Sequence, residues 1–298
     1  MQYAENTMNV VWRNVFAIRN YLNSQGHECE WVSVIAQNNG SKFAGREASK
    51  LNQYLSKRWD IVLVAYSAWY VHVDAAKAIV ASQKGARVGW LTTDYEINRH
   101  GAFNPYHFVI SNFEESFYDG KSKFYENFYC LNLNTLIYHG INSTTEKKYD
   151  CLYYGRYRED RAKYFKQYLQ GRVTLSTSSK NVRKFKLLGC KSDSWVDHID
   201  WTPGRETLNL FRSYLYIEDQ MTHKIFNHLA NRWYEGLTCR SIPFIDESCR
   251  GTFQKSGIEI PEPLYIHNYT DLVDRLDNIN ALTLKYNDNM PSWDKQAS

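Results

Sequence analysis

The sequence predicts an α/β fold made of two Rossmann-like domains that face a central cleft. Continuous apolar runs, typical of strands buried on both faces, alternate with segments of helical periodicity, which favours parallel sheets covered by helices. A polar, turn-rich segment at residues 132–148 interrupts this alternation, which then resumes. The 298 residues suffice for two domains. We therefore place an N-terminal domain at 1–140 and a C-terminal domain at 149–298, with the cleft as the expected ligand site.

The first domain is expected to begin with a helix. Four apolar residues share one face of this helix: Val11, Val15, Ile18 and Leu22. Strands are expected at 31–35, 60–66, 87–92, 107–110 and 128–131, and helices at 48–56 and 73–82. A doubly wound domain normally opens with a strand. Either that strand is missing from this chain or the domain is trimmed.

The second domain shows the same alternation. Strands are expected at 149–154, 172–176, 213–217, 241–245 and 264–267, and helices at 160–169, 205–211, 223–236 and 270–285. The first of these strands ends at Gly155, where a turn leads into the first helix.

The composition excludes several classes of protein. Hydrophobic residues make up 43% and charged residues 23% of the chain, a globular balance. The six cysteines include no C-x-x-C pair, which disfavours structural zinc and fits reduced thiols. No signal segment begins the chain, and no apolar run approaches the roughly 20 residues that span a membrane. We expect a cytoplasmic protein. The net charge of +4 permits a local nucleic-acid patch without arguing for one.

Common nucleotide-binding and hydrolase motifs are also missing. The sequence contains no G-x-G-x-x-G, no G-x-x-x-x-G-K-[ST], no G-x-S-x-G and no H-E-x-x-H. Dinucleotide binding, P-loop phosphoryl transfer, serine hydrolysis and zinc proteolysis therefore lack support.

The turn after the strand 149–154 is a candidate anion site. Gly155 is followed by Arg156, Arg158 and Arg161, and then by a helical pattern. Arginines at such a turn can bind phosphate oxygens in a bidentate manner. Taken alone, the segment could equally be a solvated, basic helix start.

Three further positions could carry chemistry in a ligand cleft. Asp94 ends the strand 87–92, where a carboxylate suits general-base work, although a turn aspartate is the commoner interpretation. Arg232 and Glu235 share one helix face. They could form a surface ion pair, or Arg232 could bind the phosphates and Glu235 the ribose hydroxyls of a nucleotide. Glu218 and Asp219 follow a strand and could bind sugar hydroxyls or form an acidic turn.

The most basic stretch of the chain contains Lys180, Arg183 and Lys184, followed by Lys186 and Lys191. A solvated helix face and a contact with a nucleic-acid backbone explain it equally well.

Together these residues resemble the bacteriophage DNA glucosyltransferases, the T-even phage β-glucosyltransferase group with its GT-B fold. The match is carried by ordered blocks: Trp59–Val64, Ala81–Lys84 and Leu91–Asp94; Tyr154–Arg158 with Arg161; Arg232–Glu235, Phe244–Glu247 and Asp271–Arg275.

The resemblance implies an inverting transfer of sugar from a UDP-sugar to a hydroxymethylated pyrimidine in double-stranded phage DNA, with the base flipped out. It implies that Asp94 is the catalytic base, that Arg158, Arg161 and Arg232 hold the diphosphate, and that Glu235 holds the ribose. It also implies UDP-glucose as the donor and an assisting divalent cation such as Mg²⁺ or Mn²⁺. We expect a donor that is UDP-glucose or a UDP-pentose, and a monomer in the infected bacterial cell.

The chain departs from the family pattern in three ways. Arg158 and Arg161 lie one residue closer together, the first strand with its loop is not evident, and the C-terminal region is shorter and lacks a full final helix. Two alternatives remain open: a GT-B transferase acting on a non-DNA acceptor, and a catalytically inactive DNA-binding relative.

Overall fold

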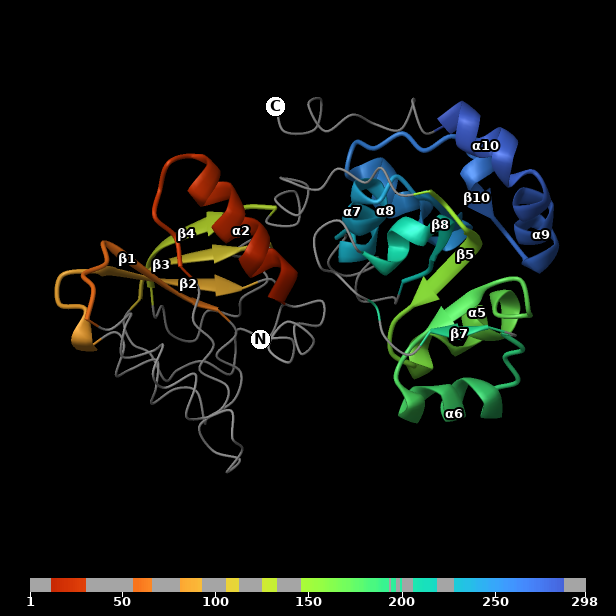
Figure 1. The fold of residues 1–298 in the computed structure, drawn as a ribbon, viewed down its shortest axis with the longest axis horizontal. Coiled ribbons are helices and arrows are strands. Elements are labelled where there is room, and N and C mark those ends of the chain that lie inside the picture. The colour runs from red at the N-terminus through yellow and green to blue at the C-terminus, as the bar shows by residue number, and fades with distance from the viewer. Residues whose placement is uncertain are drawn as a thin grey trace. The chain divides into compact units, whose positions relative to one another are not determined.

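The structure is a computed structural model, and its chain divides into two compact units, Val10–Leu136 and Ile137–Ser298 together with Met1–Asn9 (Figure 1). The structure describes residues 12–30, 56–65, 81–92, 106–112, 125–132, 146–192, 194–196, 199, 206–218 and 228–286. Each unit contains one parallel sheet in its described part.

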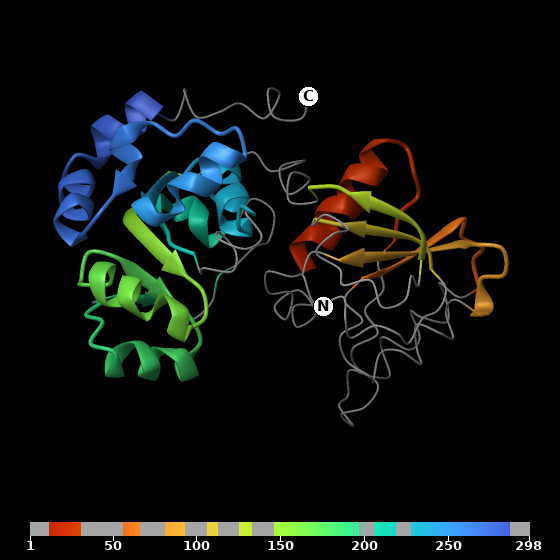
Figure 2. The same ribbon diagram turned by 180° about the vertical axis from the view of Figure 1, so that it is seen from behind.

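The first unit holds a four-stranded sheet in the order β1-β2-β3-β4. Its strands are all parallel: β1 (Ile61–Ala65), β2 (Arg87–Thr92), β3 (Tyr106–Ser111) and β4 (Tyr125–Cys130). Helix α2 (Trp12–Ser24) packs on this sheet through Ile18, which is buried together with Leu91 (Figure 2). The four predicted strands from 60–66 to 128–131 are confirmed.

Some predicted elements of this unit cannot be compared with the structure. The strand 31–35 lies outside the described residues, as do the helices 48–56 and 73–82 apart from residues 56, 81 and 82. Asp94 also lies outside them.

The second unit holds a six-stranded parallel sheet in the order β10-β9-β8-β5-β6-β7. Its strands are β5 (Tyr149–Tyr154), β6 (Thr174–Ser176), β7 (Trp195–Val196), β8 (Phe211–Tyr216), β9 (Ile242–Asp246) and β10 (Tyr265–Ile266). Counted within the unit this order is 3-2-1-4-5-6, the doubly wound Rossmann arrangement. Helices cover both faces of the sheet, which explains the apolar run Cys151–Tyr154 within β5: the Tyr153 side chain lies in one core and the Tyr154 side chain in the other.

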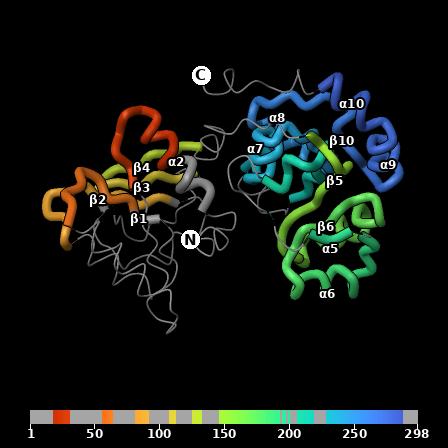
Figure 3. The backbone as a smooth tube through the Cα atoms, viewed as in Figure 1, coloured from red at the N-terminus to blue at the C-terminus, as the bar shows by residue number. Residues whose placement is uncertain are grey.

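Helices flank both faces of this sheet. They are α5 (Ala162–Tyr168), which follows the 3₁₀ turn η4 (Glu159–Arg161), and α6 (Ser179–Leu187), α7 (Asn231–Thr238), α8 (Arg250–Lys255), α9 (Tyr269–Asp277) and α10 (Ile279–Tyr286). Phe165 and Phe185 bring α5 and α6 into the Tyr153 core, while Trp233 and Phe253 bring α7 and α8 into the Tyr154 core. Figure 3 places α6 at the opposite end of this unit from α8 and α10.

The structure corrects several predicted elements. The predicted helix 205–211 is wrong, because the chain there makes only the 3₁₀ turn η5 (Thr207–Leu210) before β8 begins. The predicted helix 270–285 is two helices, since Asn278 ends α9 and its side chain donates to the Asp274 carbonyl. Of the predicted helix 223–236, residues 228–230 are described and are not helical, and α7 begins at Asn231. The sequence pattern does not predict the short elements α6, β7 and α8.

Candidate functional site

The topological switch point of the second unit lies between β5 and β8. These neighbouring strands lead to opposite halves of the sheet, and ligands of doubly wound sheets bind beyond the carboxyl ends of strands at such a point. The chain supplies Gly155 after β5 and Glu218 after β8. The candidate site is therefore built on this edge.

Two arginines and a carboxylate form the centre of the site, which we call the arginine cluster: Arg161, Glu218 and Arg232. Arg161 Nη2 lies 2.8 Å from Glu218 Oε2, and Arg232 Nη1 binds Glu218 Oε1. The three side chains come from η4, the end of β8 and α7, and their exposed fractions are 7%, 3% and 11%. Such burial makes this an ion-pair cluster of the protein interior, unlike the surface pairs that contribute little.

Arg232 is held by more than its ion pair. It donates to the Ile217 carbonyl at 2.8 Å and to the Tyr154 carbonyl at 3.1 Å, and its guanidinium lies 5.4 Å from the Tyr153 ring centre. Burial acts to lower the pKa of Arg232, but Glu218 raises it, and the net shift is upward. The sequence analysis assigned no site role to Tyr153 or Tyr154, because aromatic residues within an apolar run indicate core.

Gly155 allows the end of β5 to approach Arg232. Its φ of +148° lies in a region that side chains rarely adopt, and a Cβ there would lie 3.2 Å from Arg232 Nη2. The Gly155 N–H donates to the Ser176 carbonyl. Gly155 therefore serves the site through its backbone conformation and the space that its missing side chain leaves. Its N–H is already used within the sheet and is not a donor for a ligand.

Arg232 and Glu235 lie on α7, as their spacing predicted, but they have different partners: Arg232 binds Glu218 and two backbone carbonyls, and Glu235 binds the Tyr154 side chain. Glu235 is buried at 1% exposure and accepts a hydrogen bond from the Tyr154 hydroxyl. Tyr154 thus connects the two side chains, since its carbonyl accepts from Arg232.

The remaining predicted site residues are distributed differently. Arg156 and Arg158 are exposed, and the Arg158 side chain pairs with Asp160 at 3.6 Å, whereas Glu218 joins the Arg161 side chain to that of Arg232. Asp219 lies outside the described residues. Helix α6 exposes three basic residues: Lys180, Arg183 and Lys184, the last with its ammonium 5.6 Å from the Tyr157 ring centre.

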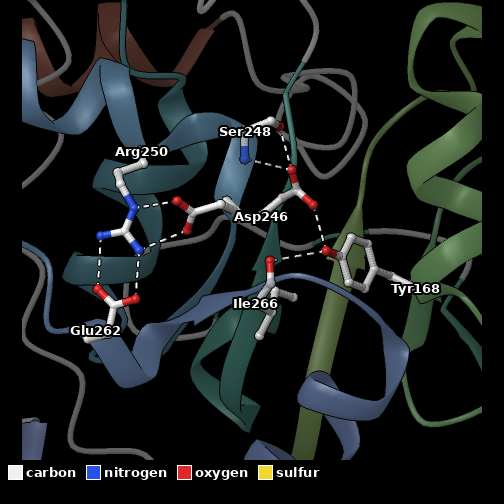
Figure 4. Close-up of polar contacts among 7 residues, drawn as sticks. Tyr168, Asp246, Ser248, Arg250, Glu262 and Ile266 are labelled. Atoms are coloured by element: carbon white, nitrogen blue, oxygen red, sulfur yellow. Dashed lines mark hydrogen bonds and ion pairs between the residues drawn. The ribbon is translucent and has the colours of Figure 1, made fainter.

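A polar network fastens the loop after β9, the strand beside β8 (Figure 4). Asp246 accepts from Tyr168 Oη at 2.5 Å and from the Ser248 N–H at 3.0 Å, which caps η7 (Glu247–Cys249). Arg250 then binds Glu262 through two hydrogen bonds of 2.9 and 2.8 Å. These polar groups find their hydrogen-bond partners within the network, which favours a structural role for it.

The described residues offer no obvious metal centre. They contain no group of three or more His, Cys, Asp or Glu side chains arranged to hold an ion. Within the same part of the chain, no helix has the length and apolar character needed to cross a membrane.

Comparisons with known proteins find a structural likeness and no sequence family. No protein-family model matches the chain, and no curated protein matches its sequence. Among solved structures, T4 phage BGT in complex with UDP and Mn²⁺ matches with a TM-score of 0.57. The chain shares its fold with T4 phage BGT. The match covers 91% of this chain and 85% of BGT at 16% identity, and it confirms the predicted α/β, GT-B-type fold class.

Proposed function

We propose that this protein is an inverting glycosyltransferase that moves a sugar from a UDP-sugar to a hydroxymethylated pyrimidine base in phage DNA. The observation that carries the proposal is the pair of buried arginines, Arg161 and Arg232, at the switch point of the sheet. The fold shared with T4 phage BGT, whose structure contains UDP, supports the same interpretation.

In this proposal the arginine cluster stabilises the leaving diphosphate. Negative charge grows on the diphosphate as the bond to the sugar breaks, and fixed guanidinium groups in a poorly hydrated site stabilise such charge. Arg161 and Arg232 are assigned this role, with the exposed Arg156 and Arg158 on the same turn as further phosphate contacts. Glu235, fixed by Tyr154, is assigned to the ribose hydroxyls.

The acceptor half of the proposal rests on the first unit and on α6. Asp94 is assigned as the general base that takes the proton from the hydroxymethyl group. Reaching that group in a duplex requires the base to be flipped out, which costs a few kcal/mol. Lys180, Arg183 and Lys184 on α6 are assigned to the DNA backbone, whose phosphates attract such an exposed basic helix.

The donor is proposed to be UDP-glucose or a UDP-pentose. Mg²⁺ or Mn²⁺ would add charge stabilisation at the diphosphate, but no residue of this chain is assigned to a cation.

A transfer assay with separate readouts tests the proposal. The protein is incubated with a panel of UDP-sugars and duplex DNA containing hydroxymethylcytosine or hydroxymethyluracil, and the nucleosides are analysed by mass spectrometry. The expected result is a mass increase of one sugar on the modified base, with none on unmodified duplex. UDP release with no mass increase on the DNA bases would instead indicate another acceptor. DNA binding without any UDP binding would indicate an inactive relative.

A further inference from the structure

Glu218 lies where the proposed function places the diphosphate. Its two carboxylate oxygens are bound by different arginines, Oε2 by Arg161 and Oε1 by Arg232. A single anionic group that bridges two guanidinium groups is also what a diphosphate would supply at this position. The sequence alone predicts only sugar binding or an acidic turn for Glu218.

The arginines present little surface to a ligand in this arrangement. Arg161 and Arg232 are 7% and 11% exposed. The donors of Arg232 are directed at Glu218, at the Ile217 carbonyl and at the Tyr154 carbonyl, and its Nε is buried without a hydrogen-bond partner in the described part of the chain. An anion must therefore replace a protein acceptor to reach these groups.

Glu218 is the acceptor best suited to leave. The Ile217 and Tyr154 carbonyls belong to the backbone at the ends of β8 and β5, whereas the Glu218 carboxylate is the end of a flexible side chain. Two buried guanidinium groups without a counter-charge would be strongly destabilising. Glu218 supplies that counter-charge in the free protein, and a diphosphate carries more negative charge and more acceptor oxygens to take over from it.

We propose that Glu218 is an internal anion that occupies the diphosphate subsite of the free protein and is displaced when the nucleotide-sugar binds. This inference rests on the proposed function, since it assigns the subsite to a diphosphate. Glu218 then acts as a specificity-determining residue: an anion of single charge, such as a carboxylate, competes poorly with it. Between turnovers, its charge also keeps Arg161 and Arg232 paired and so stabilises the arginine cluster.

The substitution Glu218→Gln tests the displacement because it removes the charge and keeps the shape. UDP and inorganic pyrophosphate are titrated by calorimetry into wild type and variant. We expect the variant to bind both ligands about tenfold more tightly or better, since each tenfold corresponds to only about 1.4 kcal/mol. Its melting temperature without ligand should fall, and saturating UDP should restore it towards that of wild type.

Matched variants identify the source of the effect. Glu206→Gln changes another buried carboxylate, which precedes the amino end of β8, and should leave UDP affinity unchanged. Glu218→Asp keeps the charge on a shorter side chain and should bind UDP with an affinity between those of wild type and Glu218→Gln. It also serves as the readout if Glu218→Gln does not fold.

The outcomes separate this inference from the proposed function. Unchanged or weaker UDP binding by Glu218→Gln overturns the displacement, and would mean that Glu218 orients the arginines in the complex. Pyrophosphate binding gained by the variant, with no UDP binding by either protein, supports displacement and removes the nucleotide assignment. If neither protein binds either ligand, both proposals fail.

Discussion

Gly155 is the residue at which strand β5 ends beside the guanidinium of Arg232. Its φ is +148°, and a Cβ added to it would lie 3.2 Å from Arg232 Nη2, so any side chain is unfavourable there. We expect Gly155→Ala to lower the free energy of unfolding by about 1 to 3 kcal/mol, the usual cost of such a backbone conformation. Urea unfolding followed by circular dichroism measures this decrease.

Gly251→Ala is the matched control for this substitution. Gly251 lies in α8 with ordinary φ and open space around its Cβ position, so alanine should be neutral or stabilise by up to about 1 kcal/mol. Equal decreases in stability in the two variants would contradict the special role of Gly155.

Lys147 gives the second unit a predictable pH response. Its ammonium donates to the Cys239 carbonyl and to Ser241 Oγ, and burial lowers its pKa from 10.5 to about 8, against the opposing influence of Cys239. Between pH 8 and 10.5 the unfolded chain holds this proton and the folded protein does not. Raising the pH through this window therefore increases stability, by at most about 3 kcal/mol at roughly 1.36 kcal/mol for each pKa unit.

The variant Lys147→Gln isolates this contribution from those of the tyrosines and thiols that titrate nearby. Urea unfolding at about pH 8 and about pH 10.5, the two ends of this window, should show wild type gaining stability relative to Lys147→Gln as the pH rises. Parallel pH dependence in the two proteins would mean that Lys147 keeps its ordinary pKa in the folded state.

At the scale of elements, residue patterns predicted the strands better than the pairing between them. The predicted strand 149–154 is β5 itself, because its residues 151–154 form the apolar run of a strand buried on both faces. Arg161 and Arg232 were also found from sequence. Their partner Glu218 was not recognised as such, since strand order alone brings the end of β8 beside β5. The resemblance assigned Arg158 and Arg161 together to the diphosphate. In the structure Arg161 binds Glu218 and Arg158 binds Asp160, and proximity in sequence could not indicate these different partners.

Short elements escaped prediction for a different reason. Helix α6 has one buried apolar residue, Phe185, among nine, so its periodicity is weak, and β7 is only two residues long. Asn278 divides α9 from α10 without glycine or proline, the usual signals for a helix end.

Helix α6 is the element whose charge should matter for DNA. Lys180, Arg183 and Lys184 are all exposed, but Lys184 also lies over the Tyr157 ring and is therefore left unchanged. We expect Lys180→Gln with Arg183→Gln to weaken DNA binding and to reduce the slope of log K against log salt by about 0.9 for each DNA phosphate that the variant no longer neutralises. Fluorescence anisotropy with labelled duplex at several salt concentrations measures both quantities.

The control pair neutralises the same number of charges at the other end of the unit. Lys255→Gln with Lys285→Gln alters exposed residues of α8 and α10 (Figure 1). Identical salt slopes for the two double variants would indicate that DNA senses only the net charge, and that α6 is a solvated helix.

At the scale of the whole molecule, the proposal divides the reaction between the two units. The residues assigned to the donor all belong to the second unit, and Asp94 belongs to the first. Donor binding and proton abstraction should therefore respond to different substitutions. The strands of each sheet could be predicted from the pattern of apolar residues within that unit. No such pattern specifies which residues of the two units act in the same reaction, and this part could not be predicted from periodicity.

Asp94→Ala tests this division of labour. If Asp94 is the general base, the variant should lose transfer by at least about a hundredfold, the lower range for general-base catalysis, while UDP affinity stays at the wild-type value. Asp60→Ala, an exposed position just before β1, is the control and should retain full transfer. Mass spectrometry of the DNA nucleosides measures transfer, and calorimetry measures UDP binding. Wild-type transfer by Asp94→Ala would remove the base assignment, and a matching loss of UDP affinity would place Asp94 in donor binding instead.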